Sequence, residues 1–236
     1  MKKKLIGRVI RIFFLYGVFA GFLFLYWGMY IFDPGQHETY FQGEDRIVEW
    51  LTFTFFLSAS IVYFLTLKYR SAMSRKAVYY FILMGLFLFV CTGEEISWGQ
   101  RIFGFETPGV ISVINEQKEF NLHNLELEYI HPYGIVSWFM LIYGIILPLV
   151  FLKKLINPDS PMRKYFSPLV LIPCFAFSIL IGSPDDFVTP SVINFFGPDN
   201  TVSYTMQSME LQEMYWGLCM FLTSVSIFRA NRRLQQ

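Results

Sequence analysis

Long apolar segments alternate with short polar ones along this chain. The six apolar segments cover residues 10–32, 47–67, 77–97, 133–152, 167–183 and 208–228. At a rise of about 1.5 Å per residue, each is long enough to cross about 30 Å of hydrocarbon as a helix, the fifth only just. The pattern therefore predicts an all-α, polytopic transmembrane helix bundle of about six spans, built as a single integral membrane domain over residues 1–236.

The basic residues predict the orientation of these spans. All Lys and Arg residues except Arg46, Arg101 and Lys118 fall in four short pieces, residues 1–11, 68–76, 153–166 and 229–236. The positive-inside rule places such pieces in the cytoplasm. Both termini are then cytoplasmic, which requires an even number of spans, and we expect a multi-pass protein of the cell inner (plasma) membrane.

Composition agrees with a lipid environment. Hydrophobic residues make up 54% of the 236 residues and charged residues only 16%, and the mean hydropathy is +0.43. A soluble domain carries about 25% charged residues. The chain shows no Walker loop, dinucleotide fingerprint or basic aromatic stripe, so membrane lipids are expected partners, and nucleotides and nucleic acid are not. The three cysteines lie in apolar segments without CxxC spacing, as is typical of buried structural thiols.

The acidic residues are distributed in the opposite way to the basic ones. All Asp and Glu residues except Asp159 lie in the longer outer loops or at the outer ends of spans. Glu49, Glu94 and Glu213 each lie about 22 to 27 Å of helix from the basic boundary, and Asp185 closes the fifth span at the same level. A carboxylate inside a span costs on the order of 2.5 kcal/mol unless it meets water, a cation or a partner. These acids are therefore either interfacial residues that reach water or parts of a shared site.

The third span ends in two adjacent glutamates. Glu94 and Glu95 are about 100° apart on a helix and cannot face the same way, so at least one points into the bundle or at a water-filled pocket. If the helix continues, Glu94, Ser97 and Arg101 share a face, and Arg101 could neutralise one glutamate.

Helical spacing groups further polar residues on the second and sixth spans. These groups are Asp45, Glu49 and Thr52, and Gln207, Glu210 and Glu213. Because like charges at one depth repel, we expect at least one proton or bound cation among them.

The outer loop over residues 98–132 is predicted to cover the acidic ends of the spans. Its first residues mix glycine and aromatics as an interfacial or re-entrant segment does. As a helix, Asn115, Glu119 and His123 would form one row, in which Glu119 and His123 could hold a metal or orient a water. The alternative is that His123 is an ordinary surface or hydrogen-bonded residue, as His37 in its polar turn is expected to be. With so few histidines, a carboxylate-rich site suits a divalent cation such as Mg, Mn or Ca, or Zn in a shell of His and acids.

Two stretches carry a resemblance to known proteins. Residues 92–101, TGEEISWGQR, and 121–124, NLHN, resemble a motif pair of a bacterial multi-pass membrane protein family with no established activity. The paired glutamates are also weakly similar to the first motif of CAAX-protease-like membrane proteins, although five residues rather than three separate Glu95 from Arg101. Alkaline-ceramidase-like membrane hydrolases, which gather acids, a serine and histidines at one membrane face, are similar by analogy only.

Three functions fit these features. The first is a membrane-embedded, metal-assisted hydrolase or transferase acting on a lipid or lipid-linked substrate at the outer face. The second is a non-catalytic assembly or sensor protein with an acidic binding site, and the third is a cation- or proton-coupled transporter. A transporter would need acids near the middle of its spans, and the inner halves of the spans lack them. For the enzyme, the expected catalytic residues are Glu94, Glu95 and His123. The expected substrate-binding residues, with Arg101 on an anionic headgroup, are Arg101, Ser97, Trp98, Gln100, Asn121 and Asn124. The expected metal ligands are Glu49, Glu119, Asp185 and Glu213.

Overall fold

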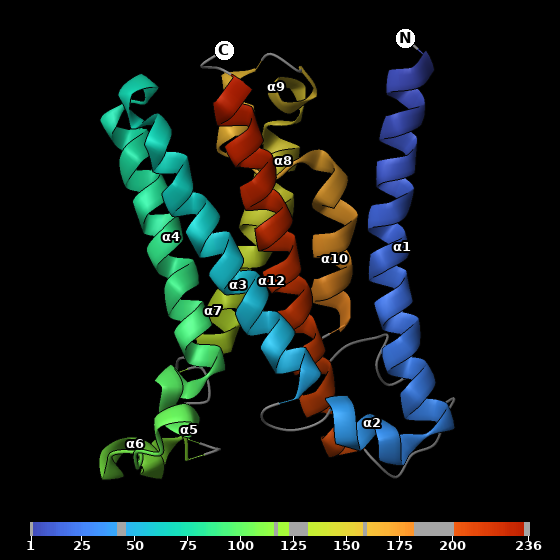
Figure 1. The fold of residues 1–236 in the computed structure, drawn as a ribbon, viewed down its shortest axis with the longest axis vertical. Coiled ribbons are helices and arrows are strands. Elements are labelled where there is room, and N and C mark those ends of the chain that lie inside the picture. Colours follow the sequence, from blue (N-terminus) through green and yellow to red (C-terminus); the bar gives the residue numbers. More distant parts are fainter. Residues whose placement is uncertain are drawn as a thin grey trace. The chain divides into compact units, whose positions relative to one another are not determined.

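The structure is a computed structural model that describes residues 2–41, 46–115, 118–122, 132–157, 160–181 and 201–233. These residues form helices and turns without a β-strand, which confirms the all-α class (Figure 1). In chain order, the elements are α1 (Lys2–Phe32), α2 (Pro34–Phe41), α3 (Ile47–Thr66), η1 (Leu67–Ala72), α4 (Arg75–Glu95), η2 (Ser97–Gly99), α5 (Gln100–Phe103), α6 (Gly109–Ile114), α7 (Pro132–Leu141), η3 (Ile142–Ile146), α8 (Leu147–Val150), α9 (Leu152–Ile156), η4 (Pro161–Lys164), η5 (Leu169–Leu171), α10 (Ile172–Ile181) and α12 (Thr201–Arg233).

Within the described residues, three stretches of helix are long and apolar enough to cross a membrane. They are Phe13–Phe32, Ile47–Ala72 and Arg75–Glu95, and they match the first three predicted spans. The fourth and fifth predicted spans correspond to shorter apolar helices, Gly134–Val150 and Leu169–Ile181. The sixth is part of the 33-residue helix α12, which is less apolar because it carries glutamates in its first half. The number of spans that cross the bilayer stays a prediction.

The chain divides into two compact units, Met1–Val48 and Glu49–Gln236. In the first unit, α2 packs on α1. Asp33 caps α2, since its carboxylate accepts a hydrogen bond from the Gln36 backbone N–H at 3.1 Å. The sequence placed His37 in a polar turn, but the side chain is fully buried. Its ring lies 4.6 Å from that of Tyr26 and 5.5 Å from that of Phe41.

The second unit holds its helices together through close backbone approaches. Ser60 on α3 donates a hydrogen bond to the Gly85 carbonyl of α4 at 2.8 Å. A Cβ on Gly217 of α12 would lie 3.1 Å from the Cβ of Phe55 and 3.3 Å from the carbonyl oxygen of Thr52. Small residues at such crossings let helices approach closely in a membrane. They bring α3 against both α4 and α12.

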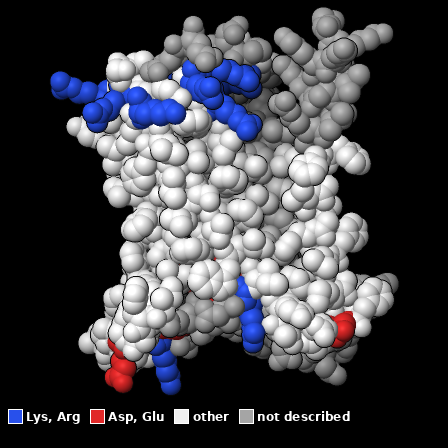
Figure 2. Space-filling model, viewed as in Figure 1, with Lys and Arg blue, Asp and Glu red and all other residues white. Residues whose placement is uncertain are grey.

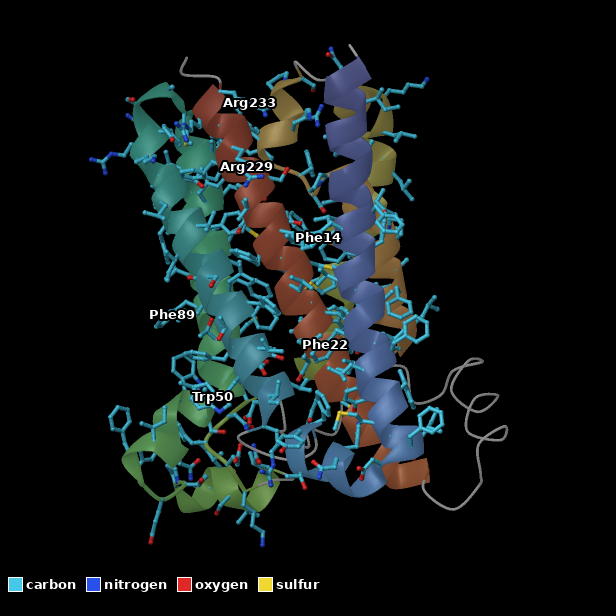
Figure 3. All side chains as sticks on the ribbon, turned by 45° about the vertical axis from the view of Figure 1, so that its right-hand side comes forward. Phe14, Phe22, Trp50, Phe89, Arg229 and Arg233 are labelled. Carbon is cyan, nitrogen blue, oxygen red and sulfur yellow. The ribbon has the colours of Figure 1, made fainter. Side chains whose placement is uncertain are left out.

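The second unit has a basic end. Apart from Lys118, the described Lys and Arg side chains of this unit gather there, with a broad band of uncharged side chains next to them (Figure 2). They come from η1, the start of α4, α9, η4 and the end of α12. Arg229 and Arg233 mark this end, and Trp50 lies near the other (Figure 3). The opposite end, where α3 and α12 carry glutamates and α4 terminates, is called the acidic end below.

Hydrogen bonds among the buried Tyr63 and Tyr143 and the partly buried Tyr80 connect the helices towards the basic end. The hydroxyl of Tyr143, in the π-helical turn η3, lies 2.9 Å from the hydroxyls of both Tyr63 and Tyr80. The Tyr80 hydroxyl donates to the Tyr165 carbonyl at 2.6 Å. Because each hydroxyl has partners, the polar atoms are satisfied inside the apolar bundle.

Candidate functional site

Glutamates from three helices of the second unit converge at its acidic end. The Glu95 carboxylate interacts electrostatically with those of Glu213, Glu49 and Glu210. Glu49 lies in the first turn of α3 and Glu95 is the last residue of α4, while Glu210 and Glu213 lie one turn apart on α12. These four residues, here called the acidic cluster, are each partly shielded from solvent.

The helix crossings described above position the acidic cluster. Gly217 lies one turn after Glu213, and Thr52 lies three residues after Glu49, so the α3–α12 crossing sets both carboxylates at one level. Their spacing is the i, i+3 and i, i+4 spacing of residues on one helix face. The predicted grouping of Glu49 with Thr52, and of Glu210 with Glu213, agrees with this arrangement.

Glu94 interacts electrostatically with its neighbour Glu95, but its hydrogen bonds go elsewhere. The Trp98 indole N–H donates to Glu94 Oε1 at 2.6 Å, and the Leu122 backbone N–H donates to Oε2. The indole of Trp98 packs against Gly93, where a Cβ would lie 2.9 Å from ring atoms. The side chain of Glu94 therefore holds the loop over the end of α4, while that of Glu95 belongs to the cluster. The two adjacent glutamates diverge as their helical spacing predicts.

A second buried network lies between η2 and residues 115–121. Ser97 Oγ donates to Glu119 Oε2, and Asn121 Nδ2 donates to the same Glu119 oxygen at 3.0 Å. Asn115 Nδ2 donates to Asn121 Oδ1 at 2.7 Å, and Asn115 Oδ1 accepts from the Glu119 N–H at 3.1 Å. Gln100 adds a link, because its Oε1 accepts from the Phe120 N–H at 2.6 Å. Four of these side chains, those of Ser97, Asn115, Glu119 and Asn121, are buried, and together they fix the loop to the end of α4.

The backbone turns sharply where this network begins. Ser97, Trp98 and Gly99 have φ values of 46°, 53° and 81°. Only glycine adopts such left-handed conformations at low cost, and strained non-glycine residues persist where the surroundings hold them. Helix α4 therefore does not continue past Glu95, and the condition under which Glu94, Ser97 and Arg101 would share a helix face is not met. The strain is maintained by the hydrogen bonds of Trp98 and Ser97.

The helix that would place Asn115, Glu119 and His123 in one row does not extend through Asn115. Helix α6 ends at Ile114, and Asn115 is extended with φ −107° and ψ 124°. Asn115 and Glu119 still meet, through the hydrogen bond from the Glu119 N–H to the Asn115 side chain. His123, Asn124 and Asp185 lie outside the described residues, as does the side chain of Arg101.

Two observations bear on the predicted metal ligands. Among the residues that the structure describes, no three His, Cys, Asp or Glu side chains form a group that could hold a metal ion. Glu119, a predicted ligand, bonds Ser97 and Asn121 and is not among the groups that interact with Glu95. A cation at the acidic cluster would thus be held through its bound waters, as Mg²⁺ often is.

Two residues near Glu95 were not among the predicted ligands or catalytic residues. Glu210, which the sequence grouped with Glu213 by its i, i+3 spacing, belongs to the acidic cluster. Cys91 lies one turn before Glu95 on α4. All three cysteines are free thiols, and Cys174 and Cys219 are buried as predicted, whereas Cys91 is only partly so.

Comparison with known proteins gives no relative: no protein-family model, curated protein or solved structure matches this chain. The function therefore has to be argued from the geometry of the acidic end itself.

Proposed function

We propose that this protein is a membrane-embedded hydrolase or transferase that acts on a lipid or lipid-linked substrate, with Glu95 at its centre. The observation that carries the proposal is that the crossings of α3 with α4 and with α12 bring Glu95 to the same end of the unit as Glu49, Glu210 and Glu213. Four carboxylates at one depth in a low-dielectric setting cannot all stay charged without a counter-charge, so a proton or a hydrated divalent cation is expected among them. Acid and base groups of this kind are what hydrolysis of a lipid headgroup or ester bond requires.

The membrane arrangement belongs to the same proposal. Six spans with both termini in the cytoplasm would place the basic end of the second unit on the cytoplasmic side of an inner membrane. The acidic end would then face the outer leaflet, where lipid headgroups meet the end of α4. In this arrangement the cluster lies at headgroup depth and not in the hydrocarbon centre.

The residues take distinct roles in this proposal. Glu95 is the general base that accepts a proton from the attacking water or hydroxyl group, and Glu49, Glu210 and Glu213 retain the cation or proton that balances it. Glu94, Ser97 and Glu119 act as positioning residues, because their hydrogen bonds hold the loop beside the cluster. His123 is proposed as a catalytic partner of Glu95, Arg101 as a ligand of the substrate's anionic headgroup and Asp185 as a cation ligand.

A non-catalytic binding protein is the second candidate. It is favoured by one observation: Ser97, two residues after Glu95, is fully buried and its hydroxyl is engaged by Glu119 and Asn121. A protein that only binds a cation or partner would need the cluster but no accessible nucleophile. Both candidates share Glu95, and they differ in whether product forms.

Turnover in liposomes tests the enzymatic proposal. The purified chain is reconstituted with bacterial inner-membrane lipids and Mg²⁺ or Mn²⁺, and released lipid fragments are measured by mass spectrometry. Wild type should form product, and Glu95→Gln should lower the rate at least 100-fold. Glu106→Gln is the matched control, because Glu106 is an exposed carboxylate outside the cluster. Equal rates for Glu95→Gln and wild type would overturn the proposal, and cation binding without any product would favour the second candidate.

A further inference from the structure

An apolar stripe runs along one side of α4. Its exposed large side chains are Tyr79, Leu83, Leu86, Phe89 and Val90. Their spacing of three and four residues puts them on one helix face. Since α4 is long and apolar enough to cross a membrane, this face is suited to contact acyl chains.

The stripe continues past the end of α4 through an aromatic contact. Phe89, which is 49% exposed, packs edge-on against Trp98, with ring centroids 6.5 Å apart. Trp98 is 38% exposed, yet its indole N–H is satisfied by Glu94. Tryptophan with a bonded N–H and an exposed ring is typical of the membrane interface.

Beyond Trp98, the apolar surface extends along the next two short helices. Phe103 on α5 is 78% exposed, and Val110 and Val113 on α6 are 80% and 82% exposed. Gly104, with φ +67°, ends α5 and allows the turn towards α6. In both ribbon views α6 lies across the direction of α4 at its end (Figures 1 and 3). If α4 crosses the bilayer, α6 therefore lies along the membrane plane.

The segment is held firmly despite its exposed apolar side chains. Gln100 Nε2 donates to Thr107 Oγ1 at 2.7 Å, and the Thr107 hydroxyl donates to the Lys118 carbonyl at 2.8 Å. The Phe105 ring packs edge-on against Phe120, with centroids 5.8 Å apart. The polar side chains of this segment thus bond to the loop that Glu94 and Gln100 hold by hydrogen bonds, while its apolar side chains remain exposed.

We propose that α5 and α6, residues Gln100–Ile114, form a wedge that inserts its apolar side chains among the lipids at the acidic end of the bundle. Exposed apolar patches mark membrane or protein contacts. Here the continuity with the α4 stripe through Phe89 and Trp98 favours lipid. The wedge requires no catalysis. If the proposed function holds, it also keeps a lipid headgroup next to the acidic cluster.

Photocrosslinking in liposomes tests the wedge. Benzoylphenylalanine replaces Phe103 or Val113 in the full chain, and the purified variants are irradiated in phosphatidylethanolamine–phosphatidylglycerol vesicles. Intact mass spectrometry should show a lipid adduct at both positions, at least tenfold above the same probe at Lys118, an exposed polar position of the same loop.

Adduct yields at Phe103 and Val113 no higher than at Lys118 would overturn the proposal. So would adducts in whole membranes that join these positions to another protein and not to lipid. Monodisperse elution in detergent checks that each variant folds. Because the readout is a lipid adduct, its failure is separable from a failure of turnover by Glu95.

Discussion

Removal of the Glu94 carboxylate should release the loop that it holds. In Glu94→Ala, the indole N–H of Trp98 and the backbone N–H of Leu122 both lose their acceptor. A donor left unsatisfied costs about 1–3 kcal/mol, so two donors give roughly 2–6 kcal/mol of local destabilisation. The loss should be concentrated in residues 118–122 and in the strained turn at Ser97 and Trp98.

Amide hydrogen exchange in detergent micelles measures this loss. At the lower limit of about 2 kcal/mol, peptides that contain Leu122 should exchange about 30-fold faster in Glu94→Ala than in wild type. Glu94→Gln keeps one acceptor oxygen and should give an intermediate increase. Glu106→Ala, which alters an exposed carboxylate of the same loop, should exchange like wild type. Unchanged exchange at Leu122 in Glu94→Ala would refute the assignment of Glu94 as the residue that holds the loop.

Three further predictions concern packing and pH. Gly217→Val should lower the free energy of unfolding by about 1–3 kcal/mol, seen as a lower melting temperature in detergent, because its side chain would enter the space of Thr52 and Phe55. Gly109→Val is the control, since a Cβ there would have nothing within 4 Å. Tyr143→Phe should lower the free energy of unfolding by about 1–2 kcal/mol in the same assay, since the hydroxyls of Tyr63 and Tyr80 lose a shared partner. Tyr79→Phe, at an exposed tyrosine, should leave the free energy of unfolding unchanged. Burial lowers the pKa of His37 below its ordinary value. Because the imidazole binds a proton more readily when α2 is released from α1, the packing of α2 on α1 should weaken as the pH falls below about 6.5. The loss is up to about 1.4 kcal/mol per pH unit. Proteolysis of α2 should therefore speed up at pH 5.5 relative to pH 8, and His37→Phe should remove that difference; equal pH dependence in both proteins would contradict the reasoning.

The sequence predicts the helical class and the positions of the long apolar helices because lipid demands runs of apolar residues. It also predicts that Glu94 and Glu95 diverge, since their angular separation on a helix is fixed. The grouping of Glu210 with Glu213 follows from the same periodicity. These inferences hold because they depend on local spacing alone.

The sequence does not predict what happens after Glu95. Ser97 and Trp98 are not residues that usually adopt positive φ. Their turn is held by the hydrogen bonds of Ser97 with Glu119 and of Trp98 with Glu94, and such tertiary contacts cannot be read from local spacing. His37 shows the same limit: its polar neighbours suggested an exposed turn, but contacts with Tyr26 and Phe41 bury it.

The most direct measurement of the central claim is Mn²⁺ binding to the purified chain, followed by electron paramagnetic resonance at neutral pH and low salt. If Glu49, Glu95, Glu210 and Glu213 act as one site, wild type should bind one Mn²⁺ per chain. Glu95→Gln and Glu213→Gln should each weaken binding at least tenfold, and the double variant should lose little more than either single one. Glu106→Gln should bind like wild type. Single variants that bind Mn²⁺ as tightly as wild type would contradict a shared site, and wild-type protein that binds no Mn²⁺ would contradict a cation at the cluster.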